Sequence, residues 1–191
     1  MQAWMDILLL IFAGFWLMLP AFLPNSAAVI FGGGKPVDLG RTWKGKRIFG
    51  DGKTWTGFIG GITAGIFLGI VQMMLALNFD PNGLWGFAPF PQALGVITAL
   101  ACGSLLGDLC GSFIKRRLGI ERGDKAAGLD QFNFIVGALL LTALLFPSWV
   151  YANFLQGDHW ISLLAILIIT PLLHRGVNII GYKIGLKKVP W

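Results

Sequence analysis

Long runs of apolar residues, separated by short polar connections, make up most of the 191-residue chain. A membrane-spanning helix needs about 20 apolar residues. Five runs approach or exceed that length, at residues 5–30, 55–77, 91–114, 132–151 and 160–182. None shows the alternation of apolar and polar side chains that is typical of a barrel strand. The pattern therefore predicts an all-α integral membrane protein with five transmembrane helices, in a single domain over residues 1–191.

The composition supports this interpretation, because only 13% of the residues are charged and 55% are hydrophobic. An ordinary soluble domain carries about twice that share of charge. The connections leave too little chain for a separate soluble domain, so any chemistry must lie in the bundle and its loops. Two cysteines are too few for a disulfide framework and lack a metal-site spacing.

Basic residues gather in alternate connections. The first loop carries six cations, the third carries five and the tail three, and Arg175 lies within the last apolar run. The N-terminal segment and the second and fourth loops carry none. By the positive-inside rule, the N-terminus lies outside and the C-terminus in the cytoplasm. We expect a multi-pass protein of the cell membrane with its active site at the cytoplasmic face.

Two glycine ridges repeat every four residues, at Gly57, Gly61, Gly65 and Gly69 and at Gly103, Gly107 and Gly111. Such ridges let helices approach closely in lipid. They permit a homodimer, and packing within one chain explains them equally well.

Asp108 ends a stretch without charge, and three consecutive cations begin seven residues later at Lys115. A charge at mid-membrane costs about 2.5–3.5 kcal/mol on the insertion scale, so this carboxylate needs a reason. One reason is a structural ion pair with Lys115 or Arg175. The others are a place in an ion pathway, or a divalent cation that serves a phosphate reaction.

The first loop, FGGGKPVDLGRTWKGKRIFGDGKTW, combines seven glycines with its cations. Glycine lets backbone N–H groups surround an anion, and the cations neutralise it. A P-loop is excluded, because its pattern requires glycine where Arg47 stands. Lys53 and Thr54 still open the second helix, whose N-terminus favours an anion. The alternative is a simple juxtamembrane segment that binds lipid headgroups.

The third loop returns Asp124 and Asp130 to the membrane face that holds Asp108. Carboxylates beside many cations indicate a Mg²⁺–polyphosphate site, because this ion is usually shared between carboxylates and substrate phosphates. The residues alone therefore suggest a Mg²⁺-dependent membrane enzyme acting on phosphates.

The third-loop pattern G-D-L-x-x-S-x-x-K-R, followed by G-x-x-x-G-D-K-x-x-G-x-x-D-Q, resembles the signature of CDP-diacylglycerol synthases. The complete chain is more similar to the short archaeal members, the CDP-archaeol synthases. The motifs that carry this resemblance are Pro24-Asn25, Pro36-x-Asp38 and the stretches 45–55, 107–116 and 123–131.

The resemblance implies transfer of a cytidylyl group from CTP to a membrane lipid phosphate, with Mg²⁺ as cofactor and pyrophosphate released. The archaeal substrate would be digeranylgeranylglyceryl phosphate. Asp108 and Asp130 would bind the metal, and Lys115 and Arg116 would bind phosphate. The nucleotide site would include Lys46, Gly50, Asp51, Gly52, Lys53 and Thr54.

Lys35 joins the nucleotide-binding set, together with Pro36 and Asp38 as candidate readers of cytosine, although Asp38 could equally cap a turn. The family usually has a second acid three residues after Asp130, where this chain has Asn133. That departure shifts the expected metal ligands towards Asp108 and Asp124.

The same residues are also compatible with other functions. The same reaction on phosphatidic acid would need the same headgroup chemistry. A phosphate or metal transporter would need polar residues at mid-membrane in several spans. A noncatalytic lipid-binding scaffold would need the cations but not the carboxylates. We expect no nucleic-acid partner, because the membrane-facing loops explain the net charge of +6. The two histidines are expected to be structural, although His174, Arg175 and Asn178 could reach the site.

Overall fold

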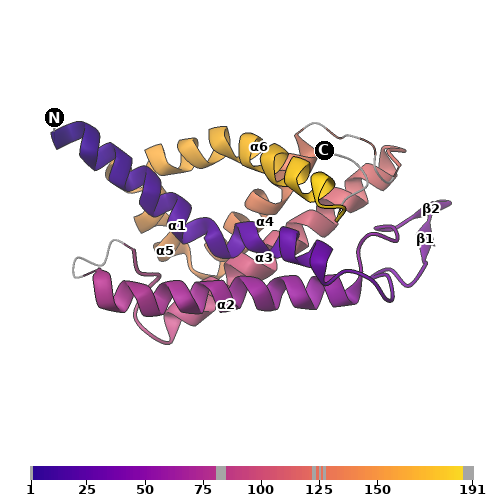
Figure 1. Ribbon diagram of the computed structural model, residues 1–191, viewed down its shortest axis with the longest axis horizontal. Helices are drawn as coiled ribbons and strands as arrows, with labels where there is room; N and C mark the ends of the chain where they lie inside the picture. Colours follow the sequence, from indigo (N-terminus) through magenta and orange to yellow (C-terminus); the bar gives the residue numbers. More distant parts are fainter. Residues whose placement is uncertain (1, 81–84, 122–123, 125, 127, 187–191) are drawn as a thin grey trace.

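The computed structural model describes residues 2–80, 85–121, 124, 126 and 128–186. Its helices are α1 (Gln2–Ile30), α2 (Trp55–Phe79), α3 (Gln92–Arg117), α4 (Leu129–Leu145), α5 (Pro147–Phe154), the 3-10 turn η1 (Gly157–His159) and α6 (Trp160–Lys183). A two-stranded antiparallel hairpin pairs β1 (Thr42–Trp43) with β2 (Lys46–Arg47). The long helices run roughly along one axis, and the hairpin projects from one end of the bundle (Figure 1). The all-helical membrane architecture expected from the sequence is confirmed.

The predicted fourth span, 132–151, is wrong as a single helix. The chain forms α4, leaves helical geometry at Phe146 and begins α5 at Pro147. Proline has no N–H to donate to the preceding turn, but it suits the first position of a new helix. Four helical segments in the described part of the chain are long and apolar enough to cross a membrane, and α4 is a shorter apolar helix of 17 residues.

The prolines of α1 are compensated by a neighbouring helix. Pro20 lacks the N–H that would bond the carbonyl of Trp16 four residues earlier. Gln72 of α2, which is 1% exposed, donates its Nε2 to that carbonyl at 2.7 Å. The amide group therefore ties α2 to α1 where the helix lacks its own donor.

Both glycine ridges pack inside the chain. A Cβ atom on Gly57, Gly61 or Gly65 would lie within 2.7 Å of a backbone carbonyl of α1. A Cβ on Gly107 would lie 2.1 Å from the carbonyl of Asn133 in α4. The ridges thus bring α2 against α1 and α3 against α4, and this use within one chain removes them as an argument for a homodimer.

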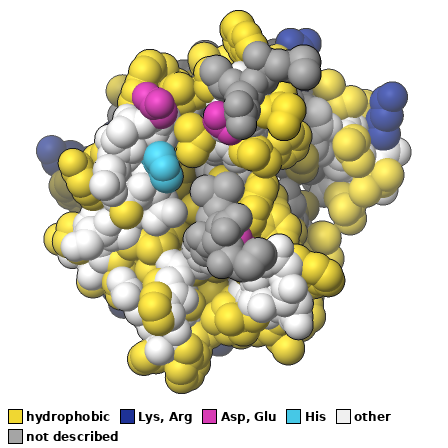
Figure 2. Space-filling model, turned by 90° about the vertical axis from the view of Figure 1, so that its left-hand side faces the viewer, with side chains coloured by type: hydrophobic (Ala, Val, Ile, Leu, Met, Phe, Trp, Pro, Cys, Tyr) yellow, Lys and Arg dark blue, Asp and Glu magenta, His cyan; other side chains and the backbone are white. Residues whose placement is uncertain are grey.

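The core lies around α3, whose Val96, Ile97 and Leu100 are fully buried, and this helix packs against α1, α2 and α4. Large apolar side chains cover the outside instead, among them Leu77 at 81% and Leu144 at 77% exposure. An apolar exterior around a packed interior suits lipid. Figure 2 shows the end of the bundle opposite the hairpin, where the surface is mainly hydrophobic and basic side chains appear only at the margin.

Candidate active site

The two basic loops lie at the same end of the bundle. The hairpin loop joins α1 to α2, and the other loop joins α3 to α4, beside the C-terminal end of α3 (Figure 1). Residues that are far apart in the sequence therefore meet around the last turns of α3.

The first loop is folded around Asp38, whose side chain is completely buried. Its Oδ1 accepts hydrogen bonds from the backbone N–H of Gly40 and from Arg47, and its Oδ2 accepts from the N–H groups of Phe49 and Gly50. Burial raises the pKa of this carboxyl, but the bonds from Arg47 and the three N–H groups outweigh it and hold the pKa well below its usual range. Asp38 thus shapes the loop, in agreement with the turn-capping alternative, and has little capacity left to read a base.

The two ends of the first loop are joined at the start of α2. Pro36 and Thr54 form an isolated β-bridge, and Lys35 accepts a hydrogen bond at its carbonyl from Trp55 at 3.1 Å. The hydroxyl of Thr54 accepts from the N–H of Gly57 at 3.2 Å and caps the helix. These contacts fix Lys53, the residue just before the cap, at the mouth of the bundle.

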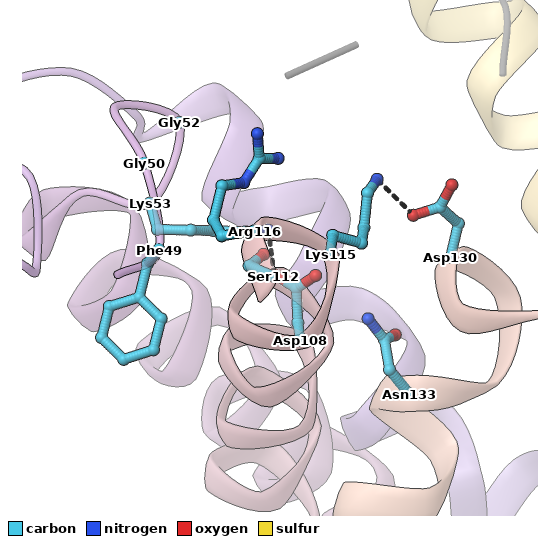
Figure 3. A pocket seen from close by; sticks show the side chains of 10 residues that line it. All are labelled: Phe49, Gly50, Gly52, Lys53, Asp108, Ser112, Lys115, Arg116, Asp130 and Asn133. Carbon is cyan, nitrogen blue, oxygen red and sulfur yellow. Dashed lines mark hydrogen bonds and ion pairs between the residues drawn. The ribbon is translucent and has the colours of Figure 1, made fainter. Parts of the chain in front are cut away.

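A cavity of about 260 Å³ opens between the first loop, α3 and α4. Figure 3 shows the side chains that surround it. Its lining comprises Phe49, Gly50, Gly52 and Lys53 from the loop, Asp108, Ser112, Lys115 and Arg116 from α3, and Asp130 and Asn133 from α4.

Asp108 forms an ion pair with Lys53, through Oδ2 and Nζ. One of the three alternatives paired Asp108 with Lys115 or Arg175, and the structure corrects that choice of partner. Lys115 instead pairs with Asp130 at 2.8 Å, and Arg175 is exposed on α6. Asp108 and Lys115 are seven residues apart, about two turns, so they lie on the same face of α3. Both line the cavity, where Asp108 pairs with the loop and Lys115 with α4.

Arg116 differs from both lysines. The part of the chain that the structure describes contains no salt bridge to its guanidinium, and its Nε is buried without a hydrogen-bond partner. A buried cationic nitrogen without an acceptor is costly. The cavity thus holds a positively charged side chain that has no ion-pair partner among the described residues.

A family profile described as "CarS-like: CDP-archaeol synthase" matches residues 7–191. The chain belongs to the CDP-archaeol synthase family. The CDP-archaeol synthase of Methanospirillum hungatei is 54% identical over 175 residues, which cover 91% of this chain and 100% of that protein. The one from Archaeoglobus fulgidus is 44% identical over 183 residues, 95% of this chain and 98% of that protein.

A solved structure of an intramembrane enzyme for archaeal membrane lipid biosynthesis is also similar. It is 37% identical in sequence and superposes with a TM-score of 0.63, over 86% of this chain and 91% of that one. The resemblance to the CDP-archaeol synthases that the motifs indicated is therefore confirmed.

The structure gathers only part of the expected site. Gly50, Gly52, Lys53, Asp108, Lys115, Arg116 and Asp130 line the cavity. Lys35, Pro36, Asp38, Lys46, Asp51, Thr54 and Asp124 do not. Asp51 pairs with Arg47 at 2.5 Å, and Lys46 donates to the carbonyl of Arg117 at 3.4 Å. Several of these residues therefore fold the loop around the site. Gly123 and Lys125, which belong to the motif, lie outside the described residues.

The expected set of three metal-binding acids is not assembled. Asp108 and Asp130 share the cavity, but the carboxylate of Asp124 is exposed and accepts a hydrogen bond from the N–H of Glu121 at 3.2 Å. Among the described residues no three His, Cys, Asp or Glu side chains form a group that could hold a metal ion. Asn133, which the sequence marked as a departure, does line the cavity.

The remaining oxygen donors still fit Mg²⁺. Two carboxylates, one amide and the hydroxyl of Ser112 border a single cavity. This ion is usually held by one or two carboxylates together with substrate phosphates, so a third protein acid is not required.

Phe49 is a lining residue that sequence reasoning missed, because nothing distinguishes it from other loop aromatics until the loop is folded. The helix α6 contributes no lining residue. His174 instead stacks on Phe134 and lies 3.2 Å from the amide of Asn178, within the bundle.

Proposed function

We propose that this protein transfers a cytidylyl group from CTP to digeranylgeranylglyceryl phosphate, giving CDP-archaeol and pyrophosphate. The family assignment supports the reaction class, and the relatives, which are CDP-archaeol synthases, indicate the product. The observation that carries the proposal for these residues is Arg116, whose buried Nε lacks an acceptor in a cavity that also contains Lys53 and Lys115.

The reaction joins two polyanions. An oxygen of the lipid phosphate forms a bond to the α-phosphorus of CTP, the bond between that phosphorus and the bridging oxygen breaks, and pyrophosphate leaves with the electron pair. A phosphate monoester is already anionic near neutral pH and needs no strong general base. The protein must therefore position two anions and neutralise the leaving group.

Each cation of the cavity has a part in that task. Arg116 offers its guanidinium, which has no ion-pair partner among the described residues, to the triphosphate. Gly50 lies beside it with a φ of 96°, which favours glycine, and because it has no side chain the nucleotide can approach the backbone there. Lys53 and Lys115 are held by Asp108 and Asp130 until substrate phosphates compete for them.

Mg²⁺ would be held by Asp108 and Asp130, with the Asn133 amide oxygen as a neutral donor, and would supply further neutralisation of phosphate charge. The carboxylates would then exchange their lysine partners for the ion. The lipid chains would remain in the bilayer while the headgroup enters the cavity from the membrane side.

The membrane topology that fits this function has five passes, with α4 and α5 together completing the fourth. The N-terminus then lies outside, and the cavity lies at the cytoplasmic face with the basic loops. Maleimide labelling of intact cells tests this orientation, in a background without Cys102 and Cys110. A cysteine in place of Lys44 should be protected, and one in place of Asp158 should be labelled; the reverse pattern refutes the orientation.

The reaction is tested with purified protein, CTP, Mg²⁺ and either digeranylgeranylglyceryl phosphate or phosphatidic acid. We expect pyrophosphate release that depends on the ether lipid and is lost in Asp108→Asn. Asp158→Asn, which removes an exposed carboxylate from η1, is the matched control. Equal turnover of phosphatidic acid would assign the acyl-lipid reaction instead. No turnover with either lipid by folded protein would refute the transferase.

A further inference from the structure

Arg117 contacts the first loop and does not line the cavity. Its guanidinium donates to the backbone carbonyl of Trp43 at 2.5 Å, and to those of Lys46 and Arg47 at 3.1 and 2.6 Å. Trp43 belongs to β1, and the other two form β2. One side chain at the end of α3 thus binds both strands of the hairpin.

Aromatic contacts reinforce this attachment. The Arg117 guanidinium carbon lies 5.4 Å from the ring centroid of Trp43 and 5.2 Å from that of Phe113, one turn earlier on α3. The two rings stack on each other with centroids 5.5 Å apart and planes inclined by 17°. Phe113 also meets Phe49, a lining residue of the cavity, at 6.5 Å. The attachment therefore extends from the hairpin to the cavity wall.

The loop is internally rigid but has few other anchors on α3. Asp38 and Arg47 organise the loop by bonds within it, and these bonds would survive if the loop moved as a unit. Besides the Arg117 contacts, the polar interactions between the described residues of the loop and α3 are the Lys53–Asp108 ion pair and a hydrogen bond from Lys46 Nζ to the Arg117 carbonyl. Substrate phosphates and Mg²⁺ would compete for the members of that ion pair, so the Arg117 attachment would have to hold the loop during the reaction.

We propose that Arg117 is a positioning residue: it fixes the first loop against α3, so that Gly50, Gly52 and Lys53 face Arg116 at the distance that CTP requires. This inference rests on the proposed function, because it assigns the loop to the nucleotide. A lysine cannot replace it, because one ammonium group cannot span carbonyls on two strands in the way a planar guanidinium does.

The test compares Arg117→Met and Arg117→Lys with wild-type protein. Steady-state kinetics should show the KM for CTP raised about 10-fold or more in both, which is the loss of one or two charge-assisted hydrogen bonds. The KM for the lipid phosphate should stay within about twofold, because the proposal assigns the loop to the nucleotide. Arg41→Met is the matched control, since it removes an exposed cation from the same loop without touching α3.

A second readout does not depend on activity. Trypsin cleavage after Lys44, in the turn of the hairpin, should accelerate about 10-fold in Arg117→Met, because opening of the loop limits cleavage. Saturating Mg²⁺ and CTP should slow cleavage after Lys44 in the wild-type protein, and should slow it less in the variant.

The outcomes separate the two proposals. Faster cleavage in Arg117→Met with an inactive wild-type protein would keep the attachment and refute the transferase. Unchanged cleavage and an unchanged KM for CTP would overturn the role of Arg117. A rise in KM of the same size in Arg41→Met would assign the effect to general charge and would overturn it as well. Equal increases in both KM values would reduce Arg117 to a general structural residue.

Discussion

Lys53 and Asp108 form an ion pair across 55 positions of sequence, joining the end of the first loop to α3. The two side chains are 29% and 22% exposed, so water reaches both. The Asp108 carboxylate is therefore not buried in the lipid phase, and its charge is not permanently neutralised by Lys53. It is available to exchange its partner when phosphate and a cation enter the cavity.

The first prediction concerns that pair. Asp108→Asn should lower kcat by about 100-fold or more, because it removes the charge that offsets phosphate repulsion and holds a cation. Lys53→Met should act mainly on the KM for CTP. A double variant that loses less than the product of the single losses would show that the two groups act as a unit.

The second prediction separates Asp130 from Asp124. Asp130 lines the cavity and pairs with Lys115, whereas Asp124 is exposed and outside it. Asp130→Asn should raise the Mg²⁺ concentration needed for half-maximal activity by about 10-fold, and Asp124→Asn should change it less than twofold. A titration of activity with Mg²⁺ measures both. The opposite order would return Asp124 to the metal site.

The third prediction concerns Arg116, whose buried Nε lacks an acceptor. Arg116→Lys keeps the positive charge but loses the planar guanidinium and its paired N–H donors. We therefore expect the KM for CTP to rise about 10-fold. The free energy of unfolding should not fall, since no protein bond to the Nε is broken. Steady-state kinetics with varied CTP and thermal unfolding provide the two measurements. A loss of stability without weaker CTP binding would contradict the assignment.

The fourth prediction follows from the low pKa of Asp38. Its folded-state pKa lies below the unfolded value of 3.8, so its ionised form contributes stability at pH above that value, and the contribution is lost as the pH falls through the folded pKa. Asp38→Asn should destabilise the loop at neutral pH by about 3 kcal/mol, since it leaves a partly buried Arg47 with one ion-pair partner fewer. Hydrogen exchange of the Phe49 and Gly50 amides should differ between the two proteins at pH 7. The difference should shrink as the pH is lowered below 3.8; a constant difference would point to another cause.

The fifth prediction tests the glycine seam between α3 and α4. Gly107→Ala would place a Cβ 2.1 Å from the carbonyl of Asn133, so α4 must move and carry Asp130 and Asn133 with it. We expect a loss of about 2 kcal/mol in stability together with reduced activity. Gly176→Ala in α6 meets nothing within 4 Å and should be neutral or stabilising by about 0.5–1 kcal/mol. Thermal unfolding of both variants decides, and equal effects would contradict tight packing at Gly107.

The hydrophobic pattern predicted most of the fold because length and apolarity decide which segments enter a bilayer. It joined α4 and α5 because Phe146 and Pro147 leave an apolar run uninterrupted, while the break depends on a backbone N–H that proline lacks. The motifs predicted the cavity residues on α3 well, since helical geometry fixes where Asp108, Lys115 and Arg116 point.

The loop residues were harder to assign. Asp38, Asp51 and Lys46 have the residue types of a nucleotide site, yet they bind Arg47 and the end of α3. Whether a loop carboxylate faces a ligand or its own loop depends on backbone turns that a single sequence does not reveal. The same holds for Asp124, whose carboxylate lies outside the cavity lining and accepts from the N–H of Glu121.

The run Lys115, Arg116 and Arg117 has a consequence for how this chain can vary in length. Successive residues of α3 point in directions about 100° apart, so the first cation meets α4, the second enters the cavity and the third holds the hairpin. Inserting or deleting one residue between Asp108 and Lys115 would rotate all three contacts to the wrong neighbours at once. The register of the last two turns of α3 is therefore constrained as a unit, far more tightly than the composition of the basic run suggests.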